Sequence, residues 1–216
     1  AGKEYLYWSE TVSGYRWAHE NFSVLIRYNT LTGKKEIFHN KDRYFNPNPS
    51  HSGQWLAAVH YQPSGKSCIH VLDAQTGIVY ESYDTPHGEY PNEMTWSEDD
   101  NLLYVLLTGE SGTSLYTLNR KTGLWDTVFP PAFQSLSDIM EFDNMLYFKT
   151  DKFLDTDNIY KLDLTDGRVF RLTNARFGAF DPLAVKKDGT LYLYYSYYTP
   201  QGYQLYKIPE KDLPGT

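Results

Sequence analysis

The feature that most constrains the fold of this chain is a tight turn that returns at an almost constant interval. Its four copies are Leu31-Thr32-Gly33, Gln75-Thr76-Gly77, Lys121-Thr122-Gly123 and Thr165-Asp166-Gly167. The glycines are therefore 44, 46 and 44 residues apart. Turns that need a positive φ accept Gly, Asn or Asp at low cost, which explains the residue types. A fixed interval of this length indicates an internal structural repeat.

A second turn keeps the same interval and divides each repeat into strands. Its copies are Ser52-Gly53, Asp99-Asp100-Asn101, Asp143-Asn144 and Asp188-Gly189. In the unit from Phe45 to Gly77, the run from Trp55 to Tyr61 is apolar enough for a strand buried on both faces. Four short strands per repeat of about 40–50 residues predict an all-β fold, a β-propeller of four-stranded antiparallel blades. A β-sandwich with evenly spaced turns is the alternative.

We expect one partial propeller domain across residues 1–216, built from about five blade units. The units cover approximately 1–42, 43–86, 87–131, 132–174 and 175–216. The first unit lacks an inner strand before Tyr5 and the fifth ends after three strands, which predicts about eighteen strands in all. Because an open ring leaves sheet edges uncovered, we expect part of a longer chain or a propeller that another segment completes. An unrecognised inner strand is the other explanation.

Composition agrees with a single all-β domain and argues against two classes of partner, nucleic acids and anionic membranes. Of the 216 residues, 41% are hydrophobic and 17% aromatic, and 20 are Tyr, which suits pleated, half-exposed strands. The net charge of -7 argues against a nucleic-acid or anionic-membrane surface, which needs clustered Lys and Arg. The sequence predicts no transmembrane segment and no signal peptide. The single cysteine, Cys68, is expected to be a small core residue.

Two stretches resemble the repeat of TolB-like propellers. Residues 48–57 read NPSHSGQWLA and residues 95–104 read TWSEDDNLLY, where that family has a Trp-Ser-Pro-Asp-Gly-Lys run before a hydrophobic strand. The Trp position is occupied by Pro49, Met140 and Val185 in three units, so the motif supports the fold better than a function. The resemblance implies a bacterial envelope protein, periplasmic or associated with the outer membrane. The same repeat also occurs beside the catalytic domains of prolyl-oligopeptidase-like peptidases.

Residues that carry catalytic or metal chemistry are sparse. The sequence has no Gly-x-Ser-x-Gly motif, so a serine hydrolase would need a further domain. The six histidines occur singly, without the spacing of metal ligands, at positions 19, 39, 51, 60, 70 and 87. One loop offers oxygens of the kind that calcium requires, from Asp151, Asp155, Asp157 and Asn158. Solvated turn carboxylates are the favoured interpretation, so we expect no catalytic residue, metal or cofactor, with calcium as the alternative.

The loops that lead into the inner strands, with the loop over residues 9–21, form the expected binding face at the channel mouth. They combine aromatic rings with Arg and His, which suit stacking on sugars or gripping a peptide. The candidate partner-binding residues are Arg43, Tyr44, His87, Tyr90, Arg176, Phe177, Tyr15 and Trp17. For Phe45, Tyr90 and Phe180 the favoured interpretation is structural, as wedges between neighbouring blades.

Two functions from different classes remain open. The first is a non-catalytic TolB-like binding module that presents this loop face to a protein, peptide or glycan in the bacterial cell envelope. The second is the propeller domain of a larger enzyme, which gates a peptidase or lines a carbohydrate-processing channel with Glu89, Asp138 and Asp181. The lack of a nucleophile with a matched base favours the first. Flanking coding sequence would discriminate between them.

Overall fold

The computed structural model describes residues 4–13, 21–38 and 42–213 and consists mainly of β-strands. The strands are β1 (Tyr5–Ser13), β2 (Asn21–Asn29), β3 (Lys35–Phe38), β4 (Tyr44–Pro49), β5 (Trp55–Tyr61), β6 (Ser67–Asp73), β7 (Val79–Asp84), β8 (Tyr90–Trp96), β9 (Leu102–Gly109), β10 (Gly112–Asn119), β11 (Trp125–Ala132), β12 (Leu136–Phe142), β13 (Met145–Thr150), β14 (Asn158–Asp163), β15 (Val169–Arg171), β16 (Ala179–Lys187), β17 (Thr190–Thr199) and β18 (Gly202–Pro209). A 3-10 turn, η2 (Glu210–Asp212), follows the last strand.

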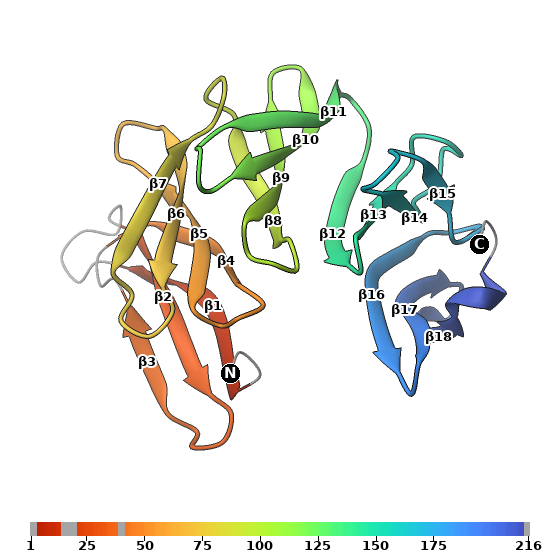
Figure 1. The fold of residues 1–216 in the computed structure, drawn as a ribbon, viewed down its shortest axis with the longest axis horizontal. Coiled ribbons are helices and arrows are strands. Elements are labelled where there is room, and N and C mark those ends of the chain that lie inside the picture. The colour runs from red at the N-terminus through yellow and green to blue at the C-terminus, as the bar shows by residue number, and fades with distance from the viewer. Residues whose placement is uncertain (1–3, 14–20, 39–41, 214–216) are drawn as a thin grey trace. The chain divides into compact units, whose positions relative to one another are not determined.

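The strands form five sheets in which consecutive strands are hydrogen-bonded neighbours (Figure 1). The sheets β1–β3 and β16–β18 have three strands, whereas β4–β7, β8–β11 and β12–β15 have four. Paired strands run antiparallel, as in β4–β5, β5–β6 and β6–β7. The predicted all-β propeller of antiparallel blades is therefore confirmed, and the β-sandwich alternative is wrong. The described residues contain eighteen strands, where about eighteen were predicted.

Two compact units make up the chain. The first is Ala1–Glu110 with Tyr116–Asp126, and the second is Ser111–Leu115 with Thr127–Thr216. The first unit holds the first two sheets with β8 and β9, and the second unit holds the last two sheets. The expectation of one domain, with unit boundaries near 42, 86, 131 and 174, stays a prediction.

Apolar cores lie between the faces of successive sheets within each unit. In the first unit, one core joins β5 and β6 to β8–β10 around Trp96, and a second joins β2 and β3 to the second sheet around Leu25. In the second unit, a core joins β13 and β14 to β16 and β17 around Tyr147. Residues 56–59 of β5 are all buried, so this strand is covered on both faces, as its sequence predicted.

The repeated turn between the third and fourth strands is an Asx turn closed by a left-handed glycine. The Asp73 carboxylate accepts hydrogen bonds from the N–H groups of Gln75 (3.0 Å) and Thr76 (2.7 Å), and Gly77 N–H donates to the Asp73 carbonyl (2.8 Å). Equivalent side-chain bonds hold the turns that begin at Asn29, Asn119 and Asp163. The φ angles of the four turn glycines are 71, 74, 70 and 75°. This region strains L residues, which explains the periodic Gly.

Three inner strands contain a bulge that carries a short polar side chain. Register shifts interrupt β4, β12 and β16, and each shift includes a residue with positive φ: Asn46 (50°), Asp138 (56°) and Asp181 (53°). The Asn46 side-chain amide donates to the carbonyl oxygen of Asn92 in β8. Asp138 Oδ2 accepts a hydrogen bond from Asp181 N–H at 3.2 Å. Bulge side chains therefore connect β4 to β8 and β12 to β16.

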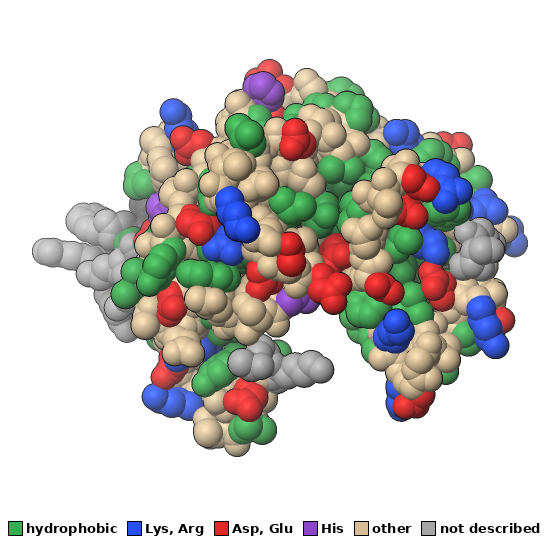
Figure 2. Space-filling view, in the orientation of Figure 1, with side chains coloured by type: hydrophobic (Ala, Val, Ile, Leu, Met, Phe, Trp, Pro, Cys, Tyr) green, Lys and Arg blue, Asp and Glu red, His purple; other side chains and the backbone are tan. Residues whose placement is uncertain are grey.

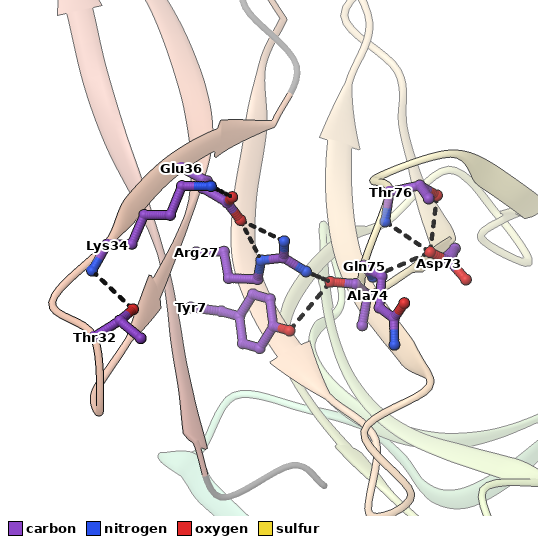
Figure 3. A network of polar contacts seen from close by, with 9 residues as sticks. All are labelled: Tyr7, Arg27, Thr32, Lys34, Glu36, Asp73, Ala74, Gln75 and Thr76. Carbon is purple, nitrogen blue, oxygen red and sulfur yellow. Dashed lines mark hydrogen bonds and ion pairs between the residues drawn. The ribbon is translucent and has the colours of Figure 1, made fainter.

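Arg27 of β2 connects the first sheet to the turn of the second sheet (Figure 3). Its Nη1 donates to the Ala74 carbonyl at 2.9 Å, and the same oxygen accepts a hydrogen bond from the Tyr7 hydroxyl at 3.2 Å. Its Nε donates to Glu36 Oε2 at 2.9 Å, while Lys34 Nζ lies 2.7 Å from Oε1. Hydrogen bonds from Lys34 and Arg27 hold the pKa of Glu36 below its ordinary value. The Arg27 side chain is 12% exposed and the Glu36 side chain 28%, so solvent screens this contact in part.

Candidate functional site

A pocket of about 430 Å³ opens in the first unit, where β4 and β8 begin. It is lined by Thr11, Phe22, Ser23, Arg43, Phe45, Tyr61 and Tyr90. These residues lie at or next to the end of β1, the starts of β2, β4 and β8, and the end of β5. Because successive strands run antiparallel, the end of one strand lies beside the start of the next, and these positions lie at the same end of their sheets. The volume falls within the range of about 300–1,000 Å³ that is common for ligand pockets.

Arg43 supplies the cationic group of this pocket. Its backbone is fixed, because its carbonyl accepts a hydrogen bond from Tyr61 N–H at 2.9 Å and it forms a parallel bridge with Ser23. Within the described part of the chain, the guanidinium has no hydrogen-bonding or ion-pairing partner. The Ser23 hydroxyl donates to the Tyr44 carbonyl at 2.6 Å. The Arg43 guanidinium therefore lines the pocket as a planar group of hydrogen-bond donors, and no acceptor for it lies among the described residues.

Aromatic rings form most of the remaining wall. The four rings are those of Phe22, Phe45, Tyr61 and Tyr90. Burial raises the pKa of the Tyr90 hydroxyl, so this group stays protonated at neutral pH and can donate a hydrogen bond. Phe45 and Tyr90 also pack against the core between the second and third sheets, which agrees with their structural interpretation as wedges. The pocket thus combines rigid apolar walls with one cation.

A smaller pocket of about 140 Å³ adjoins the first and shares Phe22, Arg43 and Tyr61 with it. Asp42 and Pro63 complete its lining. Asp42 Oδ1 lies 2.6 Å from His60 Nε2. Because a carboxylate can only accept, this contact places the proton of His60 on Nε2. Asp42 thereby connects the small pocket to His60, which belongs to a group of polar side chains in the second sheet.

His60, Cys68 and His70 form a cluster on one face of the second sheet. Their potential ligand atoms all lie within 4.8 Å of one another, and no other such group of three His, Cys, Asp or Glu side chains occurs among the described residues. His60 and Cys68 are direct cross-strand partners. The two imidazole rings stack with centroids 4.5 Å apart, and the Tyr44 hydroxyl lies 2.7 Å from His70 Nδ1. Burial raises the pKa of the Cys68 thiol, whose residue is 1% exposed.

Spacing along the chain did not predict this cluster because its members lie on two strands. Once the turn at Ser64-Gly65 defines a hairpin of β5 and β6, positions 60 and 68 become neighbours. Residues 68 and 70 share a face because side chains alternate along a strand. The hairpin register is therefore the sequence signal that would have predicted the cluster. Cys68 is buried, as expected, but its neighbours are polar rather than only apolar.

The predicted partner-binding residues of the first unit lie in different surroundings. Arg43 and Tyr90 line the large pocket, together with Phe22 and Tyr61, which sequence reasoning missed. Tyr44 is 1% exposed, and burial together with the charge of Asp42 raises the pKa of its hydroxyl. This tyrosine faces the His–Cys cluster rather than the surface.

The remaining predicted residues lie elsewhere. His87 is exposed in the turn before β8, where its backbone N–H donates a hydrogen bond to Glu89 Oε2 at 2.9 Å. Arg176 and Phe177 are exposed in the second unit, with the guanidinium 5.2 Å from the ring centroid. Tyr15 and Trp17 lie outside the described residues. The roles of these five residues in binding stay predictions.

Protein hydrogen bonds occupy oxygens of Asp151 and Asn158 in the acidic loop over residues 151–158. Asp151 Oδ1 accepts a hydrogen bond from Ser135 N–H at 2.9 Å. Asn158 is fully buried, and its Oδ1 accepts from Thr173 Oγ1 (2.9 Å) and Ala175 N–H (2.7 Å). Asn158 Oδ1 therefore already accepts two hydrogen bonds within the second unit. Calcium binding at this loop stays a prediction.

The surface shows mixed charge. On the face drawn in Figure 2, acidic side chains are interspersed with Lys and Arg, and no broad basic patch covers that face. This agrees with the net charge of -7. Among the described residues, no helix has the length and apolar character needed to cross a membrane.

Comparison with known proteins supports the fold. No protein-family model matches the sequence, and no curated protein matches it. TolB from Acinetobacter baumannii is similar in structure, with a TM-score of 0.65, 14% identity, and coverage of 94% of this chain and 52% of that chain. Acylaminoacyl peptidase from Pyrococcus horikoshii gives 0.63 and 13% identity, covering 98% of this chain and 37% of that chain. The β-propeller domain of the trilobed protease from Pyrococcus furiosus gives 0.60 and 15%, covering 99% and 67%.

These identities establish the fold alone, that of a β-propeller. The resemblance of the repeat to TolB-like propellers is thereby confirmed at the level of the fold. The chain spans about half the length of the TolB chain and less than two-fifths of the acylaminoacyl peptidase that it matches.

Proposed function

We propose that this propeller is a non-catalytic binding module and that its Arg43 pocket captures a peptide segment of a protein partner. The observation that carries the proposal is a guanidinium without a described acceptor, set among four aromatic rings in a pocket of ligand size. The guanidinium suits bidentate recognition of a carboxylate. Rigid aromatic rings supply contact area at low entropic cost. A peptide with one carboxylate beside an apolar or aromatic side chain fits this chemistry.

The net charge of the chain narrows the choice of peptide ligand further. Because the net charge is -7, a strongly acidic peptide would be repelled at long range. A single carboxylate, such as a peptide C-terminus, would meet Arg43 without that penalty. Glycans stack on aromatic rings too, but a neutral sugar leaves the charge of Arg43 without a counterpart.

Peptide selection on the immobilised 216-residue chain tests the proposal. Enriched peptides would be titrated calorimetrically against the wild type, Arg43→Ala and a matched control, Arg168→Ala, whose exposed side chain pairs locally with Asp166. We expect Arg43→Ala to weaken binding about tenfold or more, the loss typical of a charge-assisted contact. Arg168→Ala should bind as the wild type does. Equal affinity of wild type and Arg43→Ala, or a selection that enriches no peptide, would contradict the peptide proposal.

The second candidate is a propeller domain of a larger peptidase. Its support is the structural similarity to acylaminoacyl peptidase and to puromycin hydrolase, in which the chain covers 37% and 34% of the matched chains. The coding sequence on both sides of this segment tests it. A hydrolase domain there would favour the peptidase, whereas a barrel or peptidoglycan-binding domain would favour the binding module.

The bacterial envelope is the location that we propose for this module. The support is similarity to TolB at the level of the fold. Fractionation of cells that express the native protein, with immunoblotting of periplasmic, membrane and cytosolic fractions, tests it. Recovery only in the cytosolic fraction would contradict it.

A further inference from the structure

We propose that His60, Cys68 and His70 form a metal site suited to Zn²⁺. Thiolate and imidazole are the preferred zinc ligands, with bonds of about 2.3 Å to sulfur and about 2.0–2.1 Å to nitrogen. A tetrahedral ion with such bonds holds its ligand atoms roughly 3.3–3.6 Å apart. Here Cys68 Sγ lies 3.9 Å from His60 Nδ1, and all three ligand atoms lie within 4.8 Å. Small side-chain rotations would bring them around one ion.

Both histidines already have the outer hydrogen-bond partners that metal-bound imidazoles need. Asp42 accepts the Nε2–H of His60 at 2.6 Å, so Nδ1, which faces Cys68, is the ligating nitrogen. The Tyr44 hydroxyl lies 2.7 Å from Nδ1 of His70. With this hydroxyl as the acceptor of an Nδ1–H bond, Nε2 would bind the ion. Tyr44 is 1% exposed and packs in the core between the first two sheets, which fixes its hydroxyl in place.

The Cys–His pair of β6 departs from the repeat, so the shared blade structure does not explain it. Cys68 and His70 lie five and three residues before the Asx residue of their turn, Asp73. Counted in the same way, the other units place there Val24 and Ile26, Ser114 and Tyr116, and Asn158 and Tyr160. A blade of this kind therefore forms without a thiol or an imidazole at these positions. The donor set is specific to the second sheet.

Three protein ligands leave one position of a tetrahedral ion for water or another small ligand. Asp42, which orients His60, also lines the small pocket next to Arg43. Binding would replace the thiol proton of Cys68, since the thiolate is the metal ligand.

Metal titration of the 216-residue chain tests the site. The chain would be treated with a chelator, desalted, and titrated with Co²⁺ as an optical probe and with Zn²⁺ by calorimetry. We expect one ion per chain, a thiolate-to-cobalt charge-transfer absorption, and displacement of Co²⁺ by Zn²⁺. Cys68→Ser should abolish the absorption, and Asp42→Asn should weaken Zn²⁺ binding about tenfold or more, as loss of an outer partner does. His87→Ala, an exposed histidine outside the cluster, should change neither.

These outcomes test the metal site independently of the proposed peptide binding at Arg43. No charge-transfer absorption in the wild type overturns the site, as does an absorption that persists in a Cys68→Ser variant with native circular dichroism. If Cys68→Ser does not fold, the Asp42→Asn affinity decides, and a value equal to the wild type overturns the site. Arg43→Ala should retain Zn²⁺ affinity, so failure of one proposal leaves the other standing.

Discussion

At the scale of single residues, Asp73 shows how one side chain defines a turn of this propeller. Its carboxylate accepts hydrogen bonds from two backbone N–H groups and from the Thr76 hydroxyl at 2.8 Å (Figure 3). These bonds, chiefly those from Thr76, hold the pKa of Asp73 below its ordinary value of 3.8. A lowered folded pKa contributes stability above the unfolded pKa, and that stability is lost as the pH falls through the folded value.

Asp73→Asn should therefore flatten the acid dependence of stability. Asn occupies the equivalent position at residues 29 and 119, so the turn geometry is retained. We expect the wild type to melt higher than the variant at pH 7 and to lose that advantage below about pH 3.8. Thermal melts at pH 7, 4 and 3 measure this. A constant difference in Tm across that range would contradict the assignment.

Gly77 serves two purposes, because its φ is +74° and a Cβ there would lie 3.1 Å from Phe38 Cγ. Gly167 has the same conformation (φ +75°) with nothing within 4 Å, which makes it a matched control. Gly167→Ala should cost about 1–2 kcal/mol from backbone strain alone. Gly77→Ala should cost about 1–3 kcal/mol more, because Phe38 must move. Equal losses in urea denaturation would show that the Phe38 contact contributes nothing.

At the scale of the element, contacts between successive sheets carry information that the strand pattern does not. Turn glycines and strand periodicity are local properties, so the strand count and the repeat could be read from the sequence. Asn46 and Asp181 sit in bulges whose partners lie more than 40 residues away, and no local pattern marks them. The cluster of His60, Cys68 and His70 was missed for a related reason, since it depends on hairpin register.

The candidate pocket was predictable only in part. Arg43 and Tyr90 were recognised because they follow the loops that lead into inner strands. Tyr44 was recognised for the same reason, yet strand alternation turns its side chain to the core. Phe22 lies in β2 and Tyr61 at the end of β5, outside the loops that lead into inner strands, so their place in the pocket required the structure.

Arg27 tests the importance of contacts between sheets. Arg27→Lys keeps the charge but loses the fork that reaches both Glu36 and the Ala74 carbonyl. We expect a loss of about 1–3 kcal/mol, measured by urea denaturation. Arg168→Lys, which changes an exposed local pair, should cost at most about 0.5 kcal/mol. A loss for Arg27→Lys no larger than that of the control would show that the contact between the sheets is dispensable.

At the scale of the whole molecule, the chain has two compact units, each with its own core. The proposed peptide pocket and the proposed metal site both lie in the first unit. The exposed Arg176 and Phe177, which were also predicted to bind a partner, lie in the second. The chain therefore offers two candidate binding regions that an experiment can separate.

The most direct test of the central claim, binding at the Arg43 pocket, is hydrogen–deuterium exchange of the chain with and without a selected peptide. Ligand binding slows exchange where it suppresses local opening. We expect protection in residues 42–46, 60–62 and 89–92, and none in residues 174–180. Protection confined to residues 174–180, or no protection at saturating peptide, would contradict the claim.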